Sequence, residues 1–498
     1  MENLSINLGD YGFDQQGFGS GNAQEVAQLN KALSAGDITG RQTTDLYDAS
    51  GAPLKVESLE KTLKHITFSE QDIRLWKDIP KKPAYNTVEE YAQMVSYGQD
   101  RGGFNLEGEL PEEEDSVYVR RAQLVKYLGV TKSITHQMTL VNTIGGGIMQ
   151  RTIKDGTLWI LRKLTKALYH GNEDIVPLEF NGFLAQQQQS DSWSSYSDYM
   201  TSDNVVDCKG QALSEDAIQS GTNTIIENFG LATRLYAPPF VMSEFVKNFY
   251  GNKFIQPNTS ALTDGVMGQR VRTFASQNGD IDLNSDVFFN KLPNKTLASE
   301  ATTLKVAPVV VPDATTPLAV TADVTGSRFT AADAGNVFYA VSSLNRYGES
   351  KLVLMNKENA AATIAANVGV DLKFTAGTGQ NAATGFRIYR TKATTATDPT
   401  KVTFYPLYDV SLKNLQTGTE GAGANIIRDV NRFLPDCDQA MLVQFDTDVV
   451  EFAQLAPLMK MDLALLAPAY RFMILLYGTP FLYAPKKLVR IINIGRNK

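Results

Sequence analysis

Cysteine and histidine are scarce in this chain. Its 498 residues contain two cysteines, Cys208 and Cys437, and three histidines, His65, His136 and His170. One widely separated pair cannot form a disulfide framework, so both thiols are expected to be reduced. No histidine has metal-ligand spacing to a cysteine or to another histidine, and no Ser-His-Asp triad can be assembled. We therefore predict no catalytic residues, no cofactor-binding residues, no cofactor and no metal ligands.

Long apolar runs are also missing. No stretch approaches the roughly 20 apolar residues that a membrane-spanning helix needs, and the N-terminus lacks the basic start and apolar core of a secretion signal. We expect no membrane contact and a product that stays in the cytoplasm where it is made. The net charge of −7 argues against a dedicated nucleic-acid binder. Any contact with nucleic acid should be independent of base sequence and rest on local basic patches.

What the chain does have is a dense acidic segment. Six of the nine positions from Glu107 to Asp115 are acidic, and Gly108 and Pro111 interrupt any regular element there. Such a charge block is typical of a solvated tip. A divalent-cation site is the alternative, but no EF-hand spacing occurs. Residues from Val117 to Thr135 are rich in strand formers, so we predict an extended hairpin over residues 96–136.

A hairpin with so little core of its own needs a partner surface. Acidic groups at its tip are expected to face basic groups on a neighbouring subunit and to give register more than affinity. The candidate inter-subunit residues are Phe104, Glu107, Glu109, Glu112, Glu113, Glu114, Asp115, Arg120 and Arg121.

An amphipathic helix is predicted after the hairpin. Ile153, Leu161, Leu164 and Leu168 share one face of the segment from Ile148 to Tyr169, and Gly171 follows as a stop signal. Further on, the polar run from Gln186 to Ser192 is expected to be a surface loop, and Ser214 is expected to cap a helix. Near the C-terminus we predict a strand from Tyr470 to Tyr477, a turn at Gly478-Thr479-Pro480, and further strand to Ile492.

This order of hairpin, helix ending Ala167-Leu168-Tyr169-His170-Gly171-Asn172, return through Phe180-Asn181-Gly182-Phe183 and paired terminal strands resembles the major capsid proteins of tailed bacteriophages. The resemblance implies an α+β fold of the Hong-Kong-97 type, with an N-terminal arm, an extended hairpin loop, a spine helix, and peripheral and axial domains. In that family the hairpin lies over a neighbouring subunit.

Composition changes between about Lys305 and Arg428, where Thr, Ala and Val dominate and Trp and Cys are absent. Short strand-like pieces separated by turns predict an all-β sandwich, and the segment from Phe338 to Leu352 resembles an immunoglobulin or fibronectin type III module. The expected domains are therefore an arm at 1–95, the loop at 96–136, the capsid core at 137–304 and 433–498, and an inserted sandwich at 305–432.

The resemblance implies a self-assembling icosahedral shell, located in the virion, that encloses double-stranded DNA and is assembled in the host bacterial cytoplasm. Its implied partners are the chain itself, in hexamers and pentamers, together with portal, scaffolding and auxiliary or decoration proteins and the packaged DNA. Two alternatives stay open at this point. One is an encapsulin-like compartment with the same fold, and the other is a phage surface or adhesive structural protein.

Overall fold

A computed structural model of the chain describes most of the residues after Ile66. The described ranges are 67–98, 104–108, 110, 113–141, 147–188, 204–252, 271–289, 292–297, 305–379, 381–412, 415–417, 425–464 and 467–496. All of them belong to one compact unit. The predicted arm lies outside the described residues as far as Ile66.

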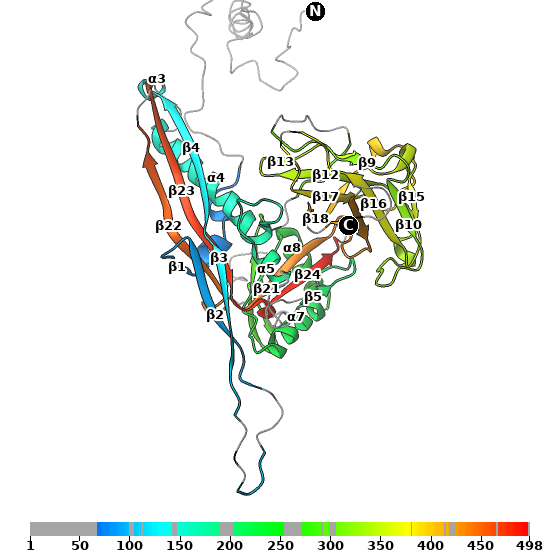
Figure 1. The fold of residues 1–498 in the computed structure, drawn as a ribbon, viewed down its shortest axis with the longest axis horizontal. Coiled ribbons are helices and arrows are strands. Elements are labelled where there is room, and N and C mark those ends of the chain that lie inside the picture. The colour runs from blue at the N-terminus through cyan, green and yellow to red at the C-terminus, as the bar shows by residue number, and fades with distance from the viewer. Residues whose placement is uncertain are drawn as a thin grey trace, which may run out of the picture. The chain divides into compact units, whose positions relative to one another are not determined.

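A four-stranded sheet is the first main element (Figure 1). Its strand order is β1 (Lys81–Pro83), β22 (Val450–Asp462), β23 (Ala469–Leu482) and β4 (Lys126–Thr135). The β1 strand runs parallel to β22, and the other neighbours are antiparallel. The two short helices α2 (Leu75–Asp78) and α3 (His136–Leu140) adjoin it in sequence. Strands far apart in the chain thus form one sheet.

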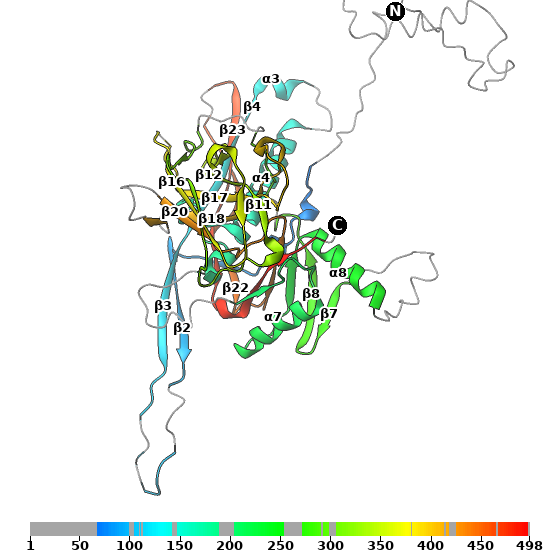
Figure 2. The ribbon, with the colours of Figure 1, turned by 90° about the vertical axis from the view of Figure 1, so that its right-hand side faces the viewer.

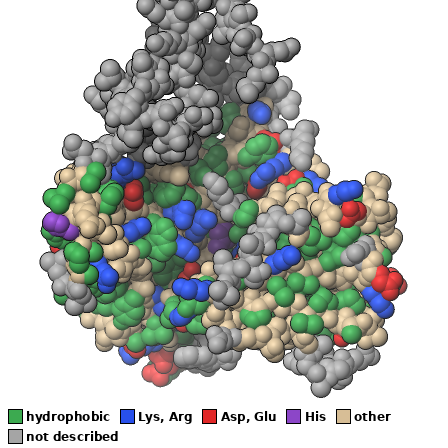
Figure 3. Space-filling model, turned by 90° about the horizontal axis from the view of Figure 1, so that it is seen from above, with side chains coloured by type: hydrophobic (Ala, Val, Ile, Leu, Met, Phe, Trp, Pro, Cys, Tyr) green, Lys and Arg blue, Asp and Glu red, His purple; other side chains and the backbone are tan. Residues whose placement is uncertain are grey.

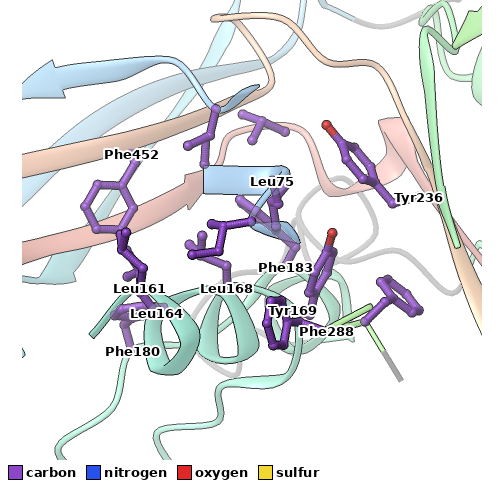
Figure 4. Close-up of a cluster of buried hydrophobic side chains, with 14 of the residues drawn as sticks. Leu75, Leu161, Leu164, Leu168, Tyr169, Phe180, Phe183, Tyr236, Phe288 and Phe452 are labelled. Atoms are coloured by element: carbon purple, nitrogen blue, oxygen red, sulfur yellow. The ribbon is translucent and has the colours of Figure 1, made fainter. Parts of the chain in front are cut away.

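Helix α4 (Ile148–His170) packs against this sheet. Its buried Ile160, Leu161, Leu164 and Leu168 recur at helical spacing. They share a core with Phe452 (Figure 4) and with Phe472, Ile474 and Leu476 of β23. The helix ends where the Gly171 N–H donates to the Ala167 carbonyl, 2.8 Å away. The predicted amphipathic helix and its stop at Gly171 are confirmed, with the last helical residue one position later.

A six-stranded sheet forms the second main element. Its order is β5 (Val205–Asp207), β24 (Leu488–Ile494), β21 (Asp438–Val443), β6 (Arg234–Ala237), β8 (Gly279–Ser285) and β7 (Thr273–Ser276). Helices α7 (Glu215–Glu227) and α8 (Pro239–Asn252) belong to the same part of the chain. The Ser214 hydroxyl accepts the Ala217 N–H at 3.2 Å, which confirms the predicted cap. Ile218 and Ile225 of α7 join the buried core beneath the sheet.

The described residues between 305 and 429 form two further sheets with a common core, the two-sheet region. The first contains β10 (Leu318–Thr321), β16 (Gly369–Thr375), β20 (Asn425–Asp429) and β19 (Gln416–Thr417), with β9 (Val311–Pro312) beside β16. The second contains β13 (Gly348–Glu349), β12 (Tyr339–Asn345), β17 (Gly385–Arg390) and β18 (Tyr405–Ser411), with β14 (Val353–Leu354) beside β12. A separate pair joins β11 (Gly335–Val337) to β15 (Ala362–Ile364).

The two sheets of this region share buried side chains. Leu372 and Phe374 from β16 lie in one cluster with Val341, Phe386 and Ile388 from the opposite sheet. The rings of Phe374 and Phe386 meet edge to face with centroids 4.9 Å apart. The all-β character expected here is therefore present. Its identity as an inserted immunoglobulin-like domain stays a prediction.

The expected turn at Gly478-Thr479-Pro480 is wrong, because β23 runs straight through it. Gly478 is needed for close approach: a Cβ there would lie 2.5 Å from the Ala453 carbonyl oxygen and would also meet the Phe452 ring. Pro480 is tolerated because β4 stops pairing at Gly478, and the partner residue Phe452 donates its N–H to Pro80 instead. Gly478 and Pro480 are therefore part of a β-strand and do not form a turn.

The expected surface loop is wrong at its start. Helix α5 (Phe183–Gln188) includes Gln186 and Gln187, which are 5% and 0% exposed. Gln186 donates to and accepts from backbone groups in the interior, and the Gln187 amide nitrogen donates to the Leu488 carbonyl, whereas the Gln187 amide oxygen has no hydrogen-bond partner among the described residues. The rest of the predicted loop lies outside the described residues.

Candidate assembly interface

A two-stranded hairpin is the part of the described chain with the least core of its own. Strands β2 (Val88–Ser96) and β3 (Val117–Leu124) are antiparallel and pair only with each other among the described strands. Residues along both alternate between exposed and half-buried, and none is buried. In Figures 1 and 2 the two strands run away from the four-stranded sheet. An isolated pair of strands is only marginally stable in water. This hairpin therefore gains little stability from contacts within its own subunit.

The predicted hairpin at 96–136 is displaced in the structure. It begins at Val88, eight residues before the predicted start, and its second strand ends at Leu124. The residues from Lys126 to Thr135 instead form β4, which pairs along its whole length with β23 and buries Ile134. Long-range pairing overrides the local pattern here, because the strand formers of β3 and β4 look alike in sequence.

Large apolar side chains near the tip are open to solvent. Phe104 is 101% exposed, Leu106 78% and Leu110 89%. Tyr97 and Tyr118, where the strands end and begin, are also exposed. Single exposed apolar residues are ordinary on protein surfaces, whereas several on one segment without a core mark an interaction site.

The predicted acidic residues divide into two groups. Glu107, Glu113, Glu114 and Asp115 are exposed, as expected for a solvated tip. Glu114 lies over Gly98, where a Cβ would be 3.0 Å from a Glu114 carboxylate oxygen and where φ is +134°. Glycine is therefore favoured at the point where the chain leaves β2. Glu109 and Glu112 lie outside the described residues.

The two predicted arginines have different surroundings. Arg120 forms an exposed pair with Glu90 at 3.4 Å within the hairpin, and such pairs contribute little to stability. Arg121 is opposite Tyr91 in the strand register. Burial raises the pKa of the Tyr91 hydroxyl, and the charge and hydrogen bond of Arg121 oppose that shift. Arg121 thus belongs to the base of the hairpin, while Phe104 and the described acids belong to its tip.

An aromatic cluster fixes the base of the hairpin to the body. Tyr91 meets Phe481 and Tyr483 edge to face, with ring centroids 5.3 Å and 4.9 Å apart. The Gln93 side chain donates to the Tyr483 carbonyl. Lys82 reaches the Tyr483 hydroxyl at 2.5 Å, and that hydroxyl donates to Glu451 at 2.8 Å. The hairpin is anchored at one end and unsupported at the other.

Gln186 adds a second anchor that sequence reasoning missed. Its amide nitrogen donates to the carbonyls of Asn181 and Pro480 at 2.6 Å and 3.0 Å. Its amide oxygen accepts the Leu482 N–H at 3.0 Å and the Gln123 amide of β3 at 3.1 Å. One buried side chain therefore links α5, β23 and the hairpin. The only sequence signal was the glutamine run itself, which is equally typical of a loop.

Within the described ranges no three His, Cys, Asp or Glu side chains gather as metal ligands. Burial raises the pKa of the free thiols of Cys208 and Cys437 to about 11 and about 12, so both stay protonated at neutral pH. No helix in the described part of the chain is long and apolar enough to cross a membrane.

The described chain has an α+β fold in which an anchored hairpin without buried residues lies beside a long helix and two sheets, the elements that the Hong-Kong-97-type resemblance led us to expect. No family model matches the chain. It is 25% identical over 471 residues to the major capsid protein of Staphylococcus phage K, covering 91% of this chain and 92% of that protein. It is 24% identical to the putative major capsid protein of Enterococcus phage phiEF24C, covering 95% and 96%.

Solved structures of similar architecture were also found. A capsid of a native GTA particle covers 90% of this chain and 99% of its own, with 9% identity and a TM-score of 0.43. A Synechococcus elongatus encapsulin complex covers 91% and 98%, with 8% identity and a TM-score of 0.38. The sequence relatives carry the assignment: the chain is a homologue of bacteriophage major capsid proteins and acts as a capsid protein. The predicted resemblance to bacteriophage major capsid proteins is confirmed by these sequence relatives.

Proposed function

We propose that copies of this chain assemble into an icosahedral head shell around double-stranded DNA, with the β2–β3 hairpin of each copy lying on a neighbour. The observation that supports this is the hairpin itself, which has exposed apolar side chains and no buried residue along either strand. The role of the whole chain is structural and not enzymatic. Assembly takes place in the host bacterial cytoplasm, and the finished location is the virion.

The energetics of such a shell rest on repetition. Burying one large apolar side chain contributes about 1.5–3 kcal/mol, so Phe104, Leu106 and Leu110 together supply only a weak contact after association costs. In a closed lattice of hexamers and pentamers, each copy gives one hairpin and on average receives one. Linked contacts then act together, and the shell is stable although each single contact is not.

Other partners follow from the same role. Portal, scaffolding and decoration proteins would meet the shell at its vertices and surfaces, and packaged DNA would contact it without base specificity. The net charge of −7 favours local basic patches over a general affinity for DNA. The acidic tip, Glu107 with Glu113 to Asp115 and including Glu109 and Glu112, would set the register on a neighbouring subunit.

The hairpin is tested by replacing Phe104, Leu106 and Leu110 together with serine. Losing three apolar contacts per copy should raise the protein concentration needed for shells more than tenfold, since every 1.4 kcal/mol is a factor of ten. The measurement is electron microscopy and sedimentation over a concentration series. Phe229→Ser is the matched control, because Phe229 is 94% exposed on a different part of the chain. Equal assembly by the triple variant and the unaltered protein would overturn the proposal.

A further inference from the structure

A polar cleft of about 760 Å³ lies between the two-sheet region and the six-stranded sheet. The end of α4, strands β18, β20 and β24, and the segment from Val430 to Gln439 contribute to its lining. Figure 3 shows lysine and arginine side chains around a central hollow on the face seen from above. A space of this size holds several residues of a peptide and is larger than a single ion requires.

The acidic side chains of the cleft are already paired with cations of the same chain. Asp409 accepts two hydrogen bonds from Arg387, at 2.6 Å and 2.7 Å, and Asp438 accepts two from Arg496, at 2.9 Å and 3.1 Å. Asp429 pairs with Arg390 at 2.9 Å, and Asp436 pairs with Lys392 at 2.7 Å. These carboxylates therefore do not make the cleft a cation site.

Arg490 differs from the other arginines of the cleft. Its guanidinium donates twice to the neutral amide oxygen of Gln439, at 3.0 Å and 2.6 Å, and lies over the Phe433 ring at 5.1 Å. No carboxylate in the described ranges is within ion-pair distance of it. Burial, with the charge of nearby Arg432, lowers the pKa of Arg490 to about 10. Arg490 is half-buried, and a partly desolvated cation beside a like charge is stabilised when an anion joins it.

We infer that this cleft binds an acidic peptide segment at Arg490 and Arg432, and that the segment is the hairpin tip of a second copy. The two guanidiniums lie over one aromatic ring, Phe433, at 5.1 Å and 6.0 Å. A carboxylate at this point would accept charge-assisted hydrogen bonds. Leu184, Leu434 and Pro293 add apolar surface to the same cleft.

The hairpin tip has the matching chemistry. Exposed Phe104, Leu106 and Leu110 stand beside the acidic run from Glu107 to Asp115. The chain from Val88 to Phe104 spans at most about 58 Å when extended, so the tip can reach well beyond its own subunit. This inference rests on the proposed function, because a second copy must be held nearby.

The test uses a synthetic peptide of residues 104–116 and the unassembled full-length chain, with binding followed by fluorescence anisotropy. Arg490→Gln and Arg432→Gln should each weaken binding about tenfold, the value of one charge-assisted contact. Arg346→Gln is the matched control, because Arg346 is exposed on the two-sheet region and does not line the cleft. Thermal melting of each variant separates lost binding from lost folding. Excess inorganic phosphate should displace the peptide.

Equal binding of a peptide with all its acids changed to Gln or Asn would overturn the inference, as would equal binding by the Arg490→Gln and Arg346→Gln variants. Displacement by phosphate without any effect of Arg490→Gln would also count against it. The peptide assay measures binding to the cleft of the unassembled chain and does not depend on shell formation. Normal shells from a chain whose cleft ignores the peptide would therefore overturn this inference and leave the proposed function standing.

Discussion

Asp286 shows how one buried residue makes the fold sensitive to pH. It is 0% exposed, accepts the Tyr169 hydroxyl at 2.9 Å and accepts the Phe288 N–H at 2.8 Å. Burial raises the pKa of this carboxyl group above its ordinary value of 3.8, and these hydrogen bonds oppose the shift only in part. The folded state therefore binds a proton more tightly than the unfolded chain does.

Because the folded-state pKa is the higher one, the contribution of Asp286 to stability is fully present below the unfolded pKa of 3.8 and is lost as pH rises through the folded pKa. Asp286→Asn cannot titrate; its single amide oxygen can still accept the Phe288 N–H, and its amide nitrogen can donate to the Tyr169 hydroxyl oxygen. We expect the variant to gain stability relative to the unaltered chain as pH rises from 4 toward 7. Urea unfolding of both proteins at several pH values measures that difference. A difference that does not change with pH would contradict the assignment.

At the scale of elements, Gln186 joins the hairpin to the body. Gln186→Leu has a similar volume but leaves the carbonyls of Asn181 and Pro480 and the N–H of Leu482 without their partner. Each unsatisfied buried group costs about 1–3 kcal/mol. We expect a loss of at least about 2 kcal/mol in the free energy of unfolding and faster proteolysis at the hairpin base.

Gln219→Leu is the control for that substitution, because Gln219 is only half-buried, on α7. Chemical unfolding gives the stability, and limited proteolysis followed by mass spectrometry locates the cuts. If both variants lose the same stability, or if new cuts arise away from β2 and β3, Gln186 does not anchor the hairpin.

Local patterns in the sequence predicted the elements that local physics decides. The spacing from Ile153 to Leu168 fixed α4, and Ser214 marked the start of α7. The tip of the hairpin was also recognisable, because charge density forbids burial. Of the proposed interface residues, Phe104 and the described acids have the exposure that the sequence led us to expect.

Long-range pairing decided the rest. Gly478 and Pro480 have the signature of a turn, yet they lie in β23 because the Phe452 ring and the end of β4 require them there. Gln186 has the signature of a loop, yet it is buried by partners that are remote in sequence. The contacts of Gly478, Pro480 and Gln186 involve residues remote in sequence. The neighbouring residues do not predict them, so these roles are seen only in the folded structure.

At the scale of the whole molecule, the residues that stabilise the folded subunit differ from those proposed to hold the shell together. The subunit interior consists of clusters beneath the two main sheets and within the two-sheet region. Among the described residues, the hairpin instead packs its base against a separate small cluster, through Tyr91 beside Ala453 and Phe481. A subunit can therefore fold before it assembles, and changes at the tip should affect assembly without affecting unfolding.

Temperature provides a test of what holds such a shell together. Burial of apolar surface weakens on cooling, because its driving force near room temperature is entropic. If Phe104, Leu106 and Leu110 are buried on neighbours, the concentration of free subunits in equilibrium with shells should rise on cooling from 30 to 5 °C. Sedimentation at each temperature measures this concentration. In the triple serine variant the dependence should be smaller, because less apolar surface is buried per copy. A fall in free subunits on cooling would show that enthalpic polar contacts dominate the lattice, and would contradict the role assigned to the hairpin tip.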